Sequence, residues 1–130
     1  MELKNYIKNQ EFITKLQPYL DSAKSVDTDA LAYIYNILKS YNLDDVCFVS
    51  TTLFILKLDD INYDEIKKQF SSEVSDMLRN LNSVGVKQSL NNEAEFENIR
   101  NMLIVMSQDV RVLIILLAYN VYKIEHLELM

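Results

Sequence analysis

Few residues in this chain could do chemistry. Its 130 residues include one cysteine, one histidine and one glycine. Zinc sites need clustered cysteine and histidine side chains, and a phosphate-binding loop needs several glycines, so the sequence predicts neither. A Ser-His-Asp triad would have to use His126, near the C-terminal end of the last predicted helix, and we reject that assignment. The chain therefore lacks the residues for the common forms of metal-dependent or nucleophilic catalysis.

The remaining reactive side chains have simpler interpretations. Cys47 lies between two apolar residues, so we interpret it as a small core residue rather than a nucleophile. A single thiol forms no intrachain disulfide, which fits a reducing compartment and predicts a cytoplasmic protein. Among 19 acidic residues the best-placed carboxylate pair is Asp59-Asp60, which we interpret as part of a solvated loop. The pair Asp44-Asp45 is typical of a helix start.

The elements that position these residues are predicted to be helices. Gly85 is the only glycine and Pro18 the only proline, and a β-sandwich or a doubly wound fold would need more residues of these types at its turns. Apolar residues make up 49% of the chain, which is enough for a core. We therefore expect an all-α fold, a compact bundle of about six to eight helices that forms a single domain over residues 1–130.

Charge and hydropathy narrow the classes of partner. The net charge of -6 disfavours general binding to nucleic acid, although it leaves room for a local basic pocket. The most apolar run, Val110 to Val121, is interrupted by Arg111 and Asn120 and is short of the ~20 residues that a membrane span needs. We expect no cofactor and no membrane partner.

Apolar periodicity gives the expected order of the first helices. The first runs from Glu2 to about Ala23, with Pro18 as a point where it could split. A polar loop is expected over Ser25 to Asp29. The next helix carries one apolar face, and the one after it, from about Asp45 to Leu56, is apolar on most sides and so predicted to be buried. The apolar face of the earlier helix consists of Leu31, Ile34, Tyr35 and Leu38.

Start signals mark the second half of the chain. Asn62 followed by Glu65 predicts a short helix, and Ser71 or Ser72 is expected to cap another. Asn82 to Asn92 is expected to be the longest loop. Further helices are predicted from Glu93 and over about Gln108 to Leu127, where Asp109 faces the positive end of the helix dipole. The last of these is the most hydrophobic along its length, so it is predicted to be the central helix.

The last third of the chain resembles the RelA/SpoT family, in the HD-type domain that hydrolyses guanosine tetra- and pentaphosphate. The resemblance rests on an Arg-x-Met-Leu piece and an Asp-x-Arg-Val piece at the spacing of that family, and it extends upstream to about Ala30. It implies an HD-domain-like helical bundle. The segments that carry it are Glu97–Leu103, Ser107–Val112, Leu116–Ile124, Tyr63–Val74 and Ile37–Val46.

The chemistry of that family does not carry over with the resemblance. The family holds one divalent ion, usually manganese, through a first His, a His-Asp pair and a later Asp. The resemblance places the first His near Ala30, the pair at Phe54-Ile55 (or at Leu53-Phe54 if the following loop is not shortened), and the later Asp at Tyr119. A downstream Glu-Asp pair falls near Leu58-Asp59, so at most one acid survives. Apolar and aromatic groups do not hold such an ion.

Two functions follow as expectations. The first is a catalytically inactive pseudo-hydrolase domain that acts as a regulatory or interaction module in guanosine tetraphosphate signalling, with a RelA/SpoT synthetase domain or another protein as its partner. The second is a stand-alone nucleotide- or protein-binding helical protein without enzymatic activity, with a guanine nucleotide as the ligand. The oligomeric state stays open. The positions expected to contact a ligand or partner are Ala30, Phe54, Ile55, Tyr119, Asn120, Tyr122 and Lys123.

Overall fold

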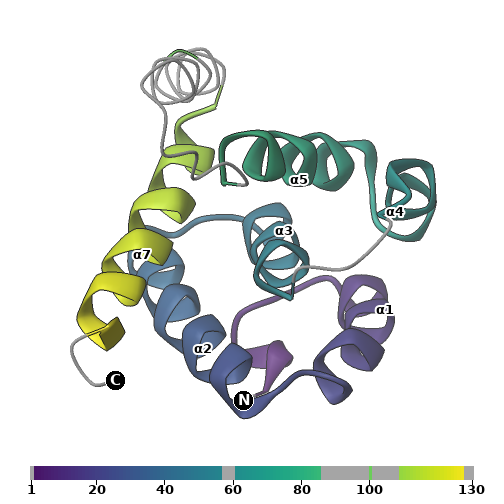
Figure 1. Ribbon diagram of the computed structural model, residues 1–130. Coiled ribbons are helices and arrows are strands. Elements are labelled where there is room, and N and C mark those ends of the chain that lie inside the picture. The colour runs from purple at the N-terminus through teal and green to yellow at the C-terminus, as the bar shows by residue number, and fades with distance from the viewer. Residues whose placement is uncertain (1, 57–60, 86–99, 101–108, 128–130) are drawn as a thin grey trace.

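The computed structural model describes residues 2–56, 61–85, 100 and 109–127, apart from the side chains of residues 26, 83–85, 126 and 127 (Figure 1). Within this part of the chain every regular element is a helix, which confirms the predicted all-α fold. The elements are a 3-10 helix, η1 (Leu3–Asn5), and the α-helices α1 (Gln10–Asp21), α2 (Ser25–Ser40), α3 (Asp45–Ile55), α4 (Tyr63–Gln69), α5 (Ser72–Gly85) and α7 (Val110–Leu127).

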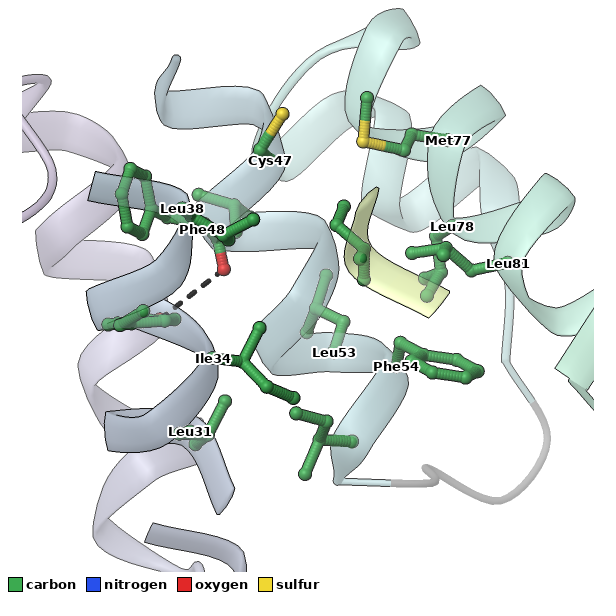
Figure 2. Close-up of a cluster of buried hydrophobic side chains, with 14 of the residues drawn as sticks. Leu31, Ile34, Leu38, Cys47, Phe48, Leu53, Phe54, Met77, Leu78 and Leu81 are labelled. Atoms are coloured by element: carbon green, nitrogen blue, oxygen red, sulfur yellow. Dashed lines mark hydrogen bonds between the residues drawn. The ribbon is translucent and has the colours of Figure 1, made fainter. Parts of the chain in front are cut away.

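The centre of the fold is α3, which packs against α1, α2, α5 and α7. Nine of its eleven residues are buried, so the prediction of a helix apolar on most sides and buried is confirmed. Leu53 lies between residues of α2, such as Ile34, and residues of α5, such as Leu78 and Leu81 (Figure 2). The apolar face predicted for α2 is fully buried.

Side chains at the helix starts explain several of the boundaries. Asn62 accepts hydrogen bonds from the N–H groups of Asp64 and Glu65, and the Ser71 hydroxyl accepts one from Val74 N–H. These confirm the two predicted start signals, because each satisfies N–H groups that have no partner within the helix. Asp44 accepts from Cys47 N–H at the start of α3. The N-terminal end of α3 therefore lies at Asp45, where the sequence analysis predicts it.

The prediction for the first helix is wrong about the position of its break. The chain leaves the helix after Asn5, and α1 begins only at Gln10, while Pro18 lies inside α1. The Asp45 carboxylate accepts hydrogen bonds from the N–H groups of Lys8 and Asn9, at 2.9 Å and 3.0 Å. This contact from a distant helix satisfies the N–H groups that the break exposes, so the break needs no proline.

Two further boundaries differ from expectation. The polar stretch Ser25 to Asp29 is the first turn of α2 and not a loop, and the Asp27 carboxylate accepts a hydrogen bond from Lys24 N–H at 3.4 Å. Short polar and acidic residues suit the first turn of a helix as well as a loop, which is why the pattern was ambiguous. α5 continues to Gly85, into the predicted loop from Asn82. The predicted helix from Glu93 and the pair Asp59-Asp60 lie outside the described residues.

The final helix is not the central one. α7 lies at the edge of the bundle and packs mainly along α2 (Figure 1). Its face away from the core carries four of the five large apolar side chains that the described residues expose, each between 43% and 64% exposed. They are Val110, Leu117, Val121 and Ile124. α7 therefore carries apolar residues on two faces, and only one of these faces packs into the core. None of the helices in the described ranges is long and apolar enough to cross a membrane.

Candidate functional site

A pocket of about 430 Å³ lies where the N-terminal end of α2, the C-terminal end of α3 and the second half of α7 meet. Its lining combines apolar, aromatic and charged side chains, the mixture typical of small-molecule sites. From α2 and the residue before it come Lys24, Asp27 and Ala30, from α3 and its end Ile55 and Leu56, and from α7 Tyr119, Tyr122 and Lys123.

The aromatic pair that the sequence placed at metal-ligand positions meets beside this pocket. The rings of Phe54 and Tyr119 pack edge to face, with their centroids 5.3 Å apart. Phe54 is buried, whereas Tyr119 is half-buried. The Lys123 ammonium lies 4.6 Å from the centroid of the Tyr119 ring, which is a cation–π contact. Tyr119 and Lys123 thus form part of the pocket wall, and Phe54 packs against Tyr119.

Tyr122 forms another part of the wall. Its ring is buried and packs against Tyr33 of α2, with the centroids 5.4 Å apart. Burial raises the pKa of the Tyr122 hydroxyl, and the negative charges of Asp29 and Asp27 raise it further. The hydroxyl is therefore neutral at physiological pH.

The structure brings together five of the seven residues that the sequence singled out. Ala30, Ile55, Tyr119, Tyr122 and Lys123 line the pocket, and Phe54 contacts it only through Tyr119. Asn120, the last of the seven, stays a prediction as a contact for a ligand or partner. It is exposed and does not line the pocket, since its neighbours Tyr119 and Lys123 occupy the inward face of α7.

Sequence reasoning missed Lys24, Asp27 and Leu56 as lining residues. The sequence gives no reason to place Lys24 and Asp27 at a pocket when Ser25 to Asp29 is predicted to be a loop. In a helix that begins at Ser25, Asp27 and Ala30 are three residues apart and share a face. This spacing was the signal that could have found Asp27. Leu56 directly follows α3 and carried no signal of its own.

The residues at this site do not fit a divalent metal ion. The positions that the resemblance aligned with metal ligands carry a methyl, a phenyl, a branched alkyl and a phenol group, in Ala30, Phe54, Ile55 and Tyr119. Among the described residues, Asp27 is the only acidic one in the lining. Across the part of the chain that the structure describes, no three His, Cys, Asp or Glu side chains come together as a metal-binding group. A hard or borderline cation needs such ligands.

A second cluster of charges fixes the start of α7 and so helps to position the pocket. Arg111 forms ion pairs with Asp109 at 2.8 Å, with Asp44 at 2.7 Å and with Glu73 at 3.9 Å. The hydrogen bonds from Arg111 hold the pKa of the Asp109 carboxyl below its usual range, despite its partial burial. Since Asp44 precedes α3 and Glu73 lies in the first turn of α5, Arg111 at the start of α7 connects three helices.

Comparison with known proteins assigns the chain to a family. No solved structure matches the chain. A family model described as HD domain matches residues 11–129, which include every α-helix of the described residues except the first residue of α1. The match covers the pocket and the Arg111 cluster alike. The chain therefore belongs to the HD domain family.

Proposed function

We propose that this HD-family domain is a catalytically inactive pseudo-hydrolase, resembling the RelA/SpoT guanosine tetraphosphate hydrolases, and that it acts as a regulatory or interaction module in guanosine tetraphosphate signalling. The observation that carries the proposal is the edge-to-face contact of Phe54 with Tyr119, at positions aligned with metal ligands. Aromatic rings stand at two of the positions where a hydrolase of this kind needs ligands for an ion and its bound water.

The chemical argument is that several ligands are replaced together. One missing ligand can be compensated by a neighbouring side chain, but four replaced positions leave no group to hold the ion or to activate water. Tyr122 and Lys123 lie in the same pocket. A lysine and a neutral phenol do not restore the lost charge.

A hydrolysis assay tests this proposal. The full chain is incubated with guanosine tetraphosphate and manganese, beside an active RelA/SpoT-family hydrolase as the positive control, and released pyrophosphate is measured. We expect no release above the background without protein. Pyrophosphate release that depends on both protein and manganese would overturn the proposal.

The interaction role is supported by the outer face of α7. Val110, Leu117, Val121 and Ile124 expose apolar surface on one helix, and such a concentration is typical of a protein-binding face. A RelA/SpoT synthetase domain is the partner that the resemblance suggests, and the cytoplasm is the compartment that the proposal assigns. Titration of a synthetase domain into the chain tests this, with Leu117→Lys as the variant and the exposed Lys15→Glu as the control. Equal binding of both variants would count against a role for α7.

The second candidate function is a stand-alone nucleotide- or protein-binding protein without enzymatic activity. It is favoured by the pocket itself, which places two lysines beside aromatic and apolar groups. Calorimetry with guanosine tetraphosphate tests the nucleotide form of this function. Absence of heat at high ligand concentration would count against it.

A further inference from the structure

The outer face of α7, at the edge of the bundle, carries a regular repeat of apolar residues (Figure 1). Val110, Leu117 and Ile124 are exposed and follow one another at intervals of seven residues. The exposed Val121 and the partly buried Ile114 fall between them, so the spacing along the five positions alternates between four and three residues. These five residues form the α7 seam. Their alternation is the spacing at which two α-helices pack along a common line of side chains, so the seam fits another helix.

Charge and symmetry indicate which helix this is. The seam contains no charged residue, so it offers apolar contact only. The chain has a net charge of -6, which opposes docking on an anionic membrane surface, where amphipathic helices need basic flanks. A seam of this spacing packs against a helix with the same spacing, and α7 of a second copy carries it. A two-fold axis needs only one such face, because both copies contribute the same residues.

The direction of the second helix follows from the charges at the two ends of α7. At the N-terminal end three carboxylates surround Arg111, which leaves that end with a net negative charge. Near the other end, the charges of Lys123 and Glu125 cancel. A parallel pair would place the two acidic ends side by side, whereas an antiparallel pair places each acidic end beside a neutral one. The second helix is therefore expected to run antiparallel.

The seam also sets the register and the size of the contact. When Leu117 faces Val121 of the second copy, Ile114 faces Ile124 of the second copy, and the two-fold axis repeats both contacts. At 1.5 Å per residue the 18-residue helix is ~27 Å long, and a contact strip ~10 Å wide covers about 270 Å². A standard interface buries ~800 Å² per partner. A strip of this size is typical of a weak, reversible contact.

We propose that the α7 seam is the interface of a weak antiparallel homodimer, in which α7 of a second copy covers it. This goes beyond the proposed function, which gives the same face to a synthetase domain. In the free protein a second copy occupies the face, so self-association and partner binding exclude each other. The exclusion rests on the proposed function, whereas the dimer itself does not.

Sedimentation equilibrium of the full chain from ~5 µM to ~1 mM tests the dimer. We expect reversible dimerisation with a Kd on the order of 100 µM, because the contact strip is small. Raising the salt concentration from ~0.05 M to ~0.5 M should tighten the dimer about threefold, because salt screens the repulsion between two chains of net charge -6. A chain that is monomeric at ~1 mM, or a dimer that salt weakens, would overturn the inference.

Disulfide trapping tests the antiparallel register. Cys47 is buried, so an introduced exposed cysteine is the thiol that reacts in the native chain. A mixture of Leu117→Cys and Val121→Cys should form an intermolecular disulfide at least about tenfold faster than Lys15→Cys, an exposed site on α1. Val110→Cys alone should match Lys15→Cys, because the register places its two copies ~27 Å apart along the helix axis. Fast trapping of Val110→Cys would show a parallel pair and overturn the proposal.

A charge in the seam separates this inference from the proposed function. Leu117→Lys should be monomeric over the same concentrations, and Lys15→Ala should dimerise like the native chain. Dimerisation of Leu117→Lys with native affinity would overturn the inference. A native chain that is monomeric and binds the synthetase domain would assign the face to that partner, so that the inference alone fails. A dimer that binds no synthetase domain would support the inference and remove the proposed interaction with that domain.

Discussion

The Cys47 thiol illustrates how its surroundings set the chemistry of a single residue. It is buried in the described core, and burial raises its pKa to about 12, with a further contribution from Asp44. Because only the thiolate reacts, about one thiol in ten thousand is ionised at pH 8. We expect no alkylation by iodoacetamide in the native protein at pH 8, and full alkylation in urea, measured by intact mass. Rapid labelling of the native protein would contradict this prediction.

Arg111 is the residue on which the junction of α3, α5 and α7 depends. Arg111→Gln removes its ion pairs with Asp109, Asp44 and Glu73. Since Arg111 is partly buried and hydrogen-bonded to more than one carboxylate, we expect a loss of about 1–2 kcal/mol in the free energy of unfolding at pH 7. Urea unfolding followed by circular dichroism measures it. A loss no larger than that of Arg79→Gln, which removes a cation–π contact with Tyr63, would contradict it.

The contact of Arg111 with Asp109 predicts that the stabilisation from Arg111 depends on pH. Hydrogen bonds from Arg111 lower the pKa of Asp109 in the folded state, so the carboxylate contributes stability above its unfolded pKa of about 3.9. That contribution is lost as the pH falls through the lower, folded pKa. The difference in unfolding free energy between the native chain and Arg111→Gln should therefore be largest near neutral pH and shrink below about pH 4. An equal difference at pH 7 and pH 3 would show that the charge of Asp109 does not contribute.

At the scale of an element, α3 combines full burial with polar side chains. The Thr52 hydroxyl donates to the carbonyl of Phe48 and hydrogen-bonds to the Tyr35 hydroxyl. The hydroxyl of Thr51, one residue earlier, is buried without a hydrogen-bond partner among the described residues. A buried polar group costs free energy when it has no partner and stabilises when it is paired.

This contrast gives a matched pair of variants on α3. Thr52→Val removes the paired hydroxyl and should lower the free energy of unfolding by about 1–2 kcal/mol. Thr51→Val replaces an unpaired hydroxyl by a methyl group of similar shape and should be neutral or stabilising by up to about 1 kcal/mol. Chemical denaturation of both variants measures the difference. If Thr51→Val lost as much stability as Thr52→Val, the hydroxyl of Thr51 would have an effective partner.

At the scale of the whole molecule, the net charge of -6 opposes binding to phosphate backbones, because a polynucleotide senses the potential of a wide surface. We expect no change in the fluorescence anisotropy of labelled DNA or RNA at about 0.15 M salt with protein up to ~100 µM. Saturable binding in this range would show a basic surface that the net charge conceals.

The sequence by itself determined the helical class, the burial of α3, the apolar face of α2 and the start signals at Asn62 and Ser71. These features follow from local periodicity and capping, which short stretches of chain encode. The resemblance also named five residues that the fold brings to one pocket, from positions as far apart as Ala30 and Lys123. Their convergence depends on the packing of α2, α3 and α7, so it could be expected only from the family likeness.

The tertiary structure alone decided three features. The break before α1 depends on Asp45, which accepts hydrogen bonds from Lys8 and Asn9 across 37 and 36 positions of sequence, respectively. The inward face of α7 depends on which of its two apolar sides meets α2, so hydrophobicity wrongly placed α7 at the centre of the bundle. Lys24 joins the pocket only because α2 begins beside α7. Local patterns record which surfaces are apolar or polar, and only packing decides which neighbour covers each of them.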